Sequence, residues 1–156
     1  LGRNQADALA TELQGAITRG TTVEAVYSSP LRAAMETADA IARDLEIDAP
    51  RIASELTTLT PEVLPSGDNA ALEALQERAW ALIEALKQEH DERSTIVLVS
   101  HELTIRAVVC RALSMALDDA YRFALDPASL TTIEFRLPGQ RERILIANLN
   151  ETCHLE

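Results

Sequence analysis

The chain has 156 residues, a net charge of −11, and a composition that is 47% hydrophobic but only 3% aromatic. This length suits one compact domain, and the apolar fraction is large enough for a buried core. So acidic a chain is a poor candidate for nucleic-acid binding, and it has no long apolar run that could cross a membrane. The two cysteines, Cys110 and Cys153, show neither a disulfide framework nor metal-ligand spacing, which favours a cytoplasmic protein.

Helix and strand periodicities alternate along the chain. Apolar residues recur every three or four positions over 6–17, 31–45 and 72–86, which predicts amphipathic helices, and 103–115 is typical of a buried helix. Short apolar segments at 23–27, 51–53 and 95–99 predict strands, the last of them buried on both faces. This order predicts a three-layer α/β/α sandwich with a mostly parallel central sheet. Two further strands, 130–137 and 143–149, flank a Pro-Gly turn signal and predict an antiparallel pair at one edge of that sheet.

The first candidate for chemistry follows the strand at 23–27. Ser28 and Ser29 end that strand, Pro30 opens a helix, and Arg32 lies in its first turn. A cation at the positive end of a helix is unfavourable unless an anion is shared there. Arg32 is therefore a candidate anion ligand. The alternative is an arginine that points into water or pairs with Glu36.

The second candidate follows the strand at 95–99. His101 falls where ligands bind in open α/β sheets, outside the carboxyl ends of the strands. The alternative is a histidine that is hydrogen-bonded to backbone. Arg106, one turn further on, is better explained by an i,i+4 ion pair with Glu102.

The two segments together suit a phosphoryl group. If both strands point to one spot, a guanidinium, an imidazole and free helix N–H groups meet there. The expected ligand is then a small phosphorylated substrate or inorganic phosphate. No metal site is expected, because the three histidines are scattered along the chain. No cofactor is expected either, since the five glycines form no dinucleotide fingerprint.

Five segments, taken in order, resemble the histidine phosphatase superfamily in its phosphoglycerate-mutase-like group. They are LGRNQA (1–6), YSSPLRAAMETA (27–38), VSHELTIRA (99–107), ASLT (128–131) and LNETCHL (149–155). The resemblance implies a phosphatase that hydrolyses small phosphomonoesters through a phosphohistidine. Two alternatives stay open: phosphotransfer of the phosphoglycerate mutase type, and a catalytically inactive phosphate-binding or interaction domain.

The resemblance also implies that a part of the family's machinery is missing. The family's nucleophilic histidine belongs to an Arg-His-Gly motif at the end of an N-terminal strand, and this sequence contains no such motif. Residues 1–156 are therefore expected to form a single histidine-phosphatase-like domain that is N-terminally incomplete and lacks a strand beside 95–99. The segment between Glu55 and Gly67 is also shorter than the family's capping loop.

Two positions depart from the family's pattern. The family's arginine sits four residues before the threonine that is Thr37 here, and Ala33 occupies that place. The phosphate role therefore passes to Arg32. Glu102 replaces the glycine that follows the second pocket histidine, His101, and would lie at the rim of the phosphate pocket.

Phosphoryl transfer needs a proton for the leaving alkoxide. The resemblance implies a glutamate shortly after the third strand, and Glu55 matches that position best, with Glu62 and Glu102 as alternatives. Each of them is otherwise an ordinary solvated carboxylate. The expected catalytic residues are thus His101, Arg32 and Glu55, the expected phosphate ligands are Arg32, His101 and Glu102, and a homodimer is a possible assembly.

Overall fold

The computed structural model describes residues 2–18, 20, 22–59, 69–136 and 141–155. Every helix and strand expected from the sequence is present within a few residues of its predicted bounds. The helices are α1 (Gly2–Thr18), α2 (Arg32–Asp44), α3 (Ala70–Glu89) and α4 (Glu102–Ala112). The strands are β1 (Val23–Ser28), β2 (Arg51–Ile52), β3 (Thr95–Val99), β4 (Leu130–Arg136) and β5 (Arg143–Glu151). Short 3₁₀ helices are η1 (Ser54–Leu56), η3 (Leu117–Tyr121) and η4 (Cys153–Leu155).

The central sheet is parallel, with the strand order β2-β1-β3. β1 and β3 pair from Val23 opposite Thr95 to Ser28 opposite Val99, which confirms that these two strands are neighbours. The backbone pairing continues past the end of β1, where the Ser29 N–H donates to the Val99 carbonyl at 2.9 Å. The carboxyl ends of both strands therefore open at the same place.

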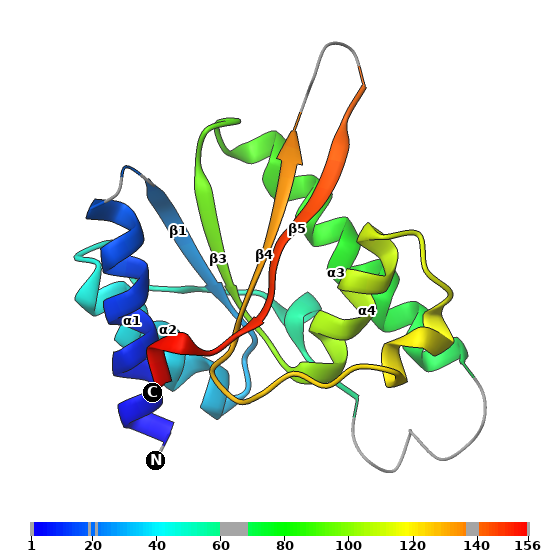
Figure 1. The fold of residues 1–156 in the computed structure, drawn as a ribbon, viewed down its shortest axis with the longest axis horizontal. Helices are drawn as coiled ribbons and strands as arrows, with labels where there is room; N and C mark the ends of the chain where they lie inside the picture. The colour runs from blue at the N-terminus through cyan, green and yellow to red at the C-terminus, as the bar shows by residue number, and fades with distance from the viewer. Residues whose placement is uncertain (1, 19, 21, 60–68, 137–140, 156) are drawn as a thin grey trace.

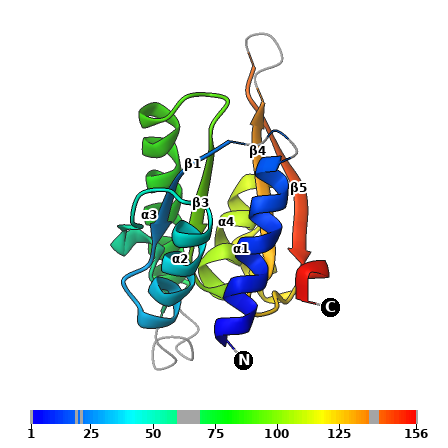
Figure 2. The same cartoon turned by 90° about the vertical axis from the view of Figure 1, so that its left-hand side faces the viewer.

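Helices cover both faces of this sheet (Figures 1 and 2). On one face α1 and α2 form a core with β1 that includes Leu9, Val26 and Ile41. On the other face α3 and η1 pack Leu86 and Leu56 against Tyr27 of β1. The three-layer arrangement follows from the apolar stripes of the helices, each of which must bury one side against the sheet.

The strands β4 and β5 form the predicted antiparallel pair, from Leu130 opposite Glu151 to Arg136 opposite Arg143. They do not extend the central sheet, however, but form a two-stranded sheet of their own. Leu130 packs against the α1–α2 core, whereas Ile133 packs against the α3–α4 side. The expected antiparallel edge is therefore present, yet it is separated from β3.

One side of β3 is open within the described part of the chain. Thr95 donates its N–H to Thr22 and Val99 accepts from Ser29, so the odd-numbered residues of β3 turn their backbone groups toward β1. Backbone groups alternate along a strand, so those of Ile96 and Leu98 point the other way, where no described strand pairs with them. All five residues of β3 are consequently half-buried rather than fully buried as the sequence predicted.

No helix among the described residues is both long and apolar enough to cross a membrane.

Candidate active site

His101 and Ser29 meet where the two parallel strands end. The His101 Nε2 lies 2.8 Å from the Ser29 Oγ, and Ser29 is fully buried. The same hydroxyl oxygen accepts the Leu31 N–H at 3.2 Å, at the start of α2. The sequence predicted that the segments after the two strands would converge, and this contact joins them.

His101 is also the N-cap residue of α4. The Ile105 N–H donates the first backbone hydrogen bond of α4 to the His101 carbonyl at 3.0 Å. The N–H groups of the preceding turn have no partner inside the helix, and the helix dipole makes this end attractive to anions. Burial lowers the pKa of the His101 imidazole, which favours its neutral form when no anion is bound.

Arg32 forms the ion pair that was its alternative explanation. Its Nε donates to the Glu36 Oε1 at 2.8 Å, and its side chain is 87% exposed. This hydrogen bond to Glu36 raises the pKa of Arg32 above its usual value. Ala33 stands at the position where the resemblance predicts an arginine. Unlike Arg32, it lines a cavity that also reaches His101. The phosphate role of Arg32 stays a prediction.

Glu102 has a well-defined structural task. Its carboxylate accepts hydrogen bonds from Arg106, the i,i+4 partner expected from the sequence, and from the Leu125 N–H. An acidic residue in the first turn also suits the helix dipole. Glu102 therefore connects the start of α4 to the segment that leads into β4, and its contact with a phosphate stays a prediction.

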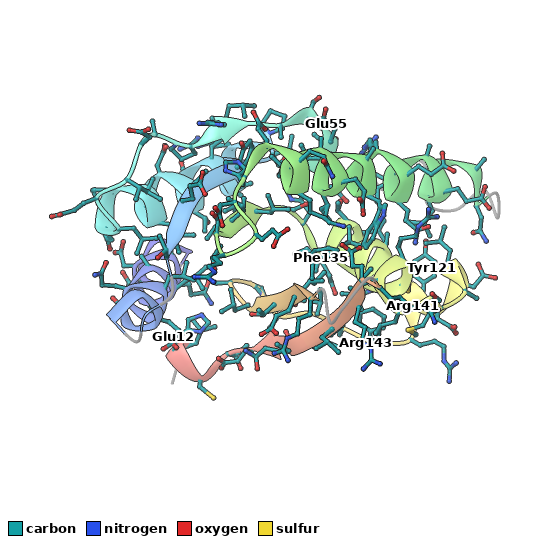
Figure 3. All side chains as sticks on the ribbon, turned by 90° about the horizontal axis from the view of Figure 1, so that it is seen from above. Glu12, Glu55, Tyr121, Phe135, Arg141 and Arg143 are labelled. Atoms are coloured by element: carbon teal, nitrogen blue, oxygen red, sulfur yellow. The ribbon has the colours of Figure 1, made fainter. Side chains whose placement is uncertain are left out.

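Glu55 lies in η1, and Figure 3 shows it on the outer side of the molecule. Its neighbour Leu56 is buried and lines the cavity. The alternative acid Glu62, with most of the segment between Glu55 and Gly67, lies outside the described residues.

Polar residues that the sequence did not single out hold η1 and the following Thr57 beside the site. The Ser100 Oγ donates to the Leu56 carbonyl at 2.7 Å, and the Thr104 Oγ1 donates to the Thr57 carbonyl at 3.0 Å. Arg78 of α3 donates to the same carbonyl at 2.9 Å. Thr104 could have been singled out, since it is a polar residue on the buried face of a helix.

A cavity of about 2170 Å³ runs from this site along β3. It separates β3 from the β4–β5 pair, and Phe135 of β4 lines it (Figure 3). Its walls also include side chains of α1, α2, α3 and α4. Among the described residues no group of three or more His, Cys, Asp or Glu is placed to hold a metal ion.

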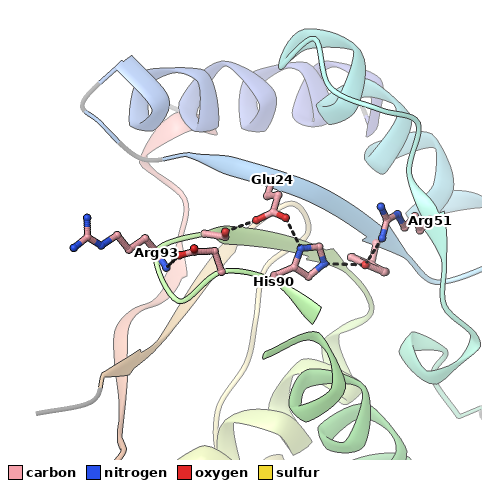
Figure 4. Close-up of polar contacts among 7 residues, drawn as sticks. Glu24, Arg51, His90 and Arg93 are labelled. Carbon is pink, nitrogen blue, oxygen red and sulfur yellow. Dashed lines mark hydrogen bonds and ion pairs between the residues drawn. The ribbon is translucent and has the colours of Figure 1, made fainter. Parts of the chain in front are cut away.

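A second polar cluster lies away from His101 and fastens the end of α3 to the sheet (Figure 4). Arg51 donates to the Tyr27 hydroxyl oxygen at 2.9 Å, and that hydroxyl lies 3.0 Å from the His90 Nε2. The other ring nitrogen of His90, Nδ1, lies 2.8 Å from Glu24. Hydrogen bonds from Ser94 and His90 lower the pKa of the Glu24 carboxyl. The cluster thus explains His90 as a structural residue.

The fold is an α/β sandwich in which a histidine lies at the carboxyl ends of two neighbouring parallel strands, and sequence comparison identifies the class of protein. The family description "Histidine phosphatase superfamily (branch 1)" matches residues 1–57 and 50–148. The chain belongs to this superfamily.

Individual relatives agree with this assignment. Phosphoserine phosphatase 1 of Hydrogenobacter thermophilus is 28% identical over 179 residues, which cover 99% of this chain and 80% of the relative. A phosphoserine phosphatase variant from Entamoeba histolytica, solved with phosphoserine, has a TM-score of 0.74 at 24% identity over 97% of this chain and 83% of its own. A mycobacterial glucosyl-3-phosphoglycerate phosphatase also has a TM-score of 0.74, at 20% identity over 97% and 86%. These two structures share the fold of this chain.

Proposed function

We propose that this chain belongs to a phosphatase that hydrolyses small phosphomonoesters through a phosphohistidine, and that His101 lies in its phosphate site. The observation that carries the proposal is the His101–Ser29 contact, which puts an imidazole at the ends of two parallel strands and at the start of α4. These groups suit a phosphoryl group because imidazolium and helix N–H groups all donate to its oxygens. The relative solved with phosphoserine supports a substrate of this size and charge.

In the proposed reaction a histidine nitrogen attacks phosphorus, and the bond from phosphorus to the ester oxygen breaks. Glu55 gives its proton to the leaving alkoxide and later takes one from the water that hydrolyses the nitrogen–phosphorus bond. His101 and Arg32 neutralise charge on the phosphoryl oxygens as the transition state forms. The nucleophile is not supplied by an Arg-His-Gly motif of these 156 residues, because the sequence has none.

Arg32 can serve this site only by exchanging Glu36 for the substrate. The two side chains are 87% and 50% exposed, so their ion pair is screened by water and weak. A dianionic phosphate next to the helix N-terminus is a stronger partner for a guanidinium than one exposed carboxylate. The proposal therefore requires Arg32 to turn inward when phosphate binds.

One observation favours the inactive phosphate-binding domain as a second candidate. Ala33 lines the cavity at the position where the resemblance predicts a guanidinium, so the site begins with less positive charge. Such a domain would bind phosphate through His101 and the start of α4 but would not hydrolyse an ester. Phosphotransfer of the mutase type has no comparable support from the described residues.

The test separates binding from turnover. Inorganic phosphate is expected to shift the ring-proton NMR signals of His101 and to raise its pKa, while the matched variants His101→Asn and His154→Asn should respectively lose and keep phosphate binding. Added imidazole can replace a missing histidine nucleophile in hydrolysis of p-nitrophenyl phosphate. Imidazole-dependent turnover that His101→Asn abolishes supports the phosphatase. Binding without such turnover supports the inactive domain, and no effect of phosphate on His101 contradicts both.

A further inference from the structure

The hydrogen bond between Ser29 and His101 determines which nitrogen of the imidazole ring can hold a ligand. A neutral imidazole has one N–H donor and one acceptor nitrogen, and its hydrogen-bond partners select between the two forms. We propose that Ser29 is a positioning residue of the phosphate site, because its hydroxyl donates to the His101 Nε2 and so keeps the proton of the neutral ring on Nδ1. The inference rests on the proposed phosphate role of His101.

The surroundings of the Ser29 hydroxyl decide the direction of this hydrogen bond. Its oxygen already accepts the Leu31 N–H at 3.2 Å and lies 2.8 Å from the His101 Nε2. Ser29 is fully buried, and the described residues offer its hydroxyl proton no acceptor other than Nε2. If Nε2 carried a proton, the oxygen would accept two hydrogen bonds and its own proton would be left buried without a partner, which is costly. The hydroxyl therefore donates to Nε2.

The second ring nitrogen of His101, Nδ1, is then the donor that a ligand can reach. No residue of the described part of the chain pairs with Nδ1, and this atom is not buried. His101 lines the cavity, whereas Ser29 does not. A phosphate oxygen in the cavity can therefore accept a hydrogen bond from Nδ1, beside the first N–H groups of α4, which have no partner inside the helix.

Backbone contacts hold Ser29 in the place that this role needs. The Ser29 N–H donates to the Val99 carbonyl at 2.9 Å, and the Ser29 carbonyl accepts the Ser28 hydroxyl at 2.8 Å. Leu31, whose N–H the Ser29 side chain accepts, is the N-cap residue of α2. The serine is thus fixed to β3 and α2 before a ligand binds. This lowers the entropy that is lost when the imidazole donor is oriented toward phosphate.

The position of this proton has a consequence for the charge that phosphate binding requires. A neutral His101 with its proton on Nδ1 already donates to a phosphate oxygen, and an imidazolium donates from the same atom. Burial lowers the pKa of His101, so the neutral ring is favoured when no phosphate is bound. The charged neighbour of the ring on α4, Glu102, is already paired with Arg106. Phosphate is therefore expected to bind above the His101 pKa as well as below it.

The test begins with the unaltered chain. Nitrogen NMR distinguishes a protonated ring nitrogen from a bare one, and above the His101 pKa it should show the proton on Nδ1. The matched variants are Ser29→Ala and Ser28→Ala, since both serines are fully buried but the Ser28 hydroxyl donates to a backbone carbonyl instead of the ring. Ser29→Ala removes a donor to the neutral ring, so it should move the proton toward Nε2 and raise the His101 pKa. Ser28→Ala should change neither.

Phosphate binding by the two variants separates this role from a general loosening of the site. Above the measured His101 pKa, Ser29→Ala should bind inorganic phosphate roughly two- to tenfold more weakly than the unaltered chain, which is the range for one hydrogen bond. Below that pKa both ring nitrogens carry protons, so the difference should disappear. Ser28→Ala should bind phosphate like the unaltered chain at both pH values.

A proton on Nε2 in the unaltered chain would overturn the proposal, and this result can be obtained even if Ser29→Ala does not fold. Unchanged phosphate affinity in Ser29→Ala would also overturn it, as would a loss that is equal above and below the pKa or equally large in Ser28→Ala. Phosphate that binds beside a His101 ring protonated on Nε2 would remove the role of Ser29 and leave the proposed function in place. No effect of phosphate on His101 would contradict the proposed function and the role of Ser29 with it.

Discussion

Glu36→Gln is the most direct test of whether Arg32 belongs to the phosphate site. Glu36 holds the Arg32 Nε at 2.8 Å and also lines the cavity that reaches His101. The change removes both the competitor for the guanidinium and one negative charge near the expected position of the phosphate. Phosphate affinity should therefore increase.

The size of this gain follows from the exposure of the pair. The side chains of Arg32 and Glu36 are 87% and 50% exposed, so their ion pair is a surface pair. Breaking such a pair changes an equilibrium constant that depends on it by at most about fivefold. Phosphate binding, measured by calorimetry at low ionic strength, should tighten by roughly two- to fivefold in Glu36→Gln and weaken in Arg32→Ala.

Asp44→Asn is the matched control, since Asp44 forms a similar exposed pair with Arg43 at the other end of α2. It removes the same charge from the same helix and should change phosphate binding less than Glu36→Gln does. If neither Glu36→Gln nor Arg32→Ala alters the affinity, Arg32 takes no part in phosphate binding. Ala33→Arg would then be the variant that restores a guanidinium to the cavity.

Three further outcomes are expected. Ser29→Ala should lower the free energy of unfolding by about 1–3 kcal/mol in urea titrations, because a fully buried hydroxyl with two partners is lost, whereas exposed Thr11→Ala should cost less than about 0.5 kcal/mol. Burial lowers the pKa of His101 below its ordinary 6.5, so the unfolded chain binds more protons than the folded chain below that pH. The free energy of unfolding should therefore keep its full value above pH 6.5 and decrease as the pH falls toward the folded pKa. His101→Asn should lose less of this free energy over the same pH range. Lys87 of α3 forms an ion pair with Glu142 and lies over the Phe135 ring of β4. Lys87→Met should therefore speed amide exchange in β4 and shift the fluorescence of Trp80, which packs against Phe135, and unchanged values would mean that these contacts do not hold the β4–β5 pair.

Local patterns were sufficient to predict the secondary structure of this chain. The apolar stripe that includes Ile41 repeats every three or four residues, which is the period of a helix. The unbroken apolar segment at 95–99 is instead typical of a short strand. The neighbourhood of β1 and β3 was also predictable, because both strands are followed by polar residues and helices. These features depend on residues that are close in the sequence.

The gaps in the prediction concern which contacts form, rather than which helices and strands form. That β4 does not join β3 depends on what lies between them, and no pattern within either strand encodes it. The sequence offered Arg32 two partners, a bound anion and Glu36, and did not show that the side chain pairs with Glu36. The same is true of Glu102, whose bond to the Leu125 N–H spans 23 residues. Such choices are decided by differences smaller than those that select a helix or a strand.

One edge of β3 has no partner strand among the described residues, and this has a consequence for how the chain behaves at high concentration. Its five residues, Thr-Ile-Val-Leu-Val, contain no charge, proline or glycine, a composition that favours strand stacking between molecules. The net charge of −11 opposes this by keeping identical copies apart. Repulsion of this kind reaches about 10 Å at 0.1 M salt and about 3 Å at 1 M. Colloidal stability of this chain should therefore depend on ionic strength, so that concentrated salt promotes fibrous or amorphous aggregation even where every helix remains folded.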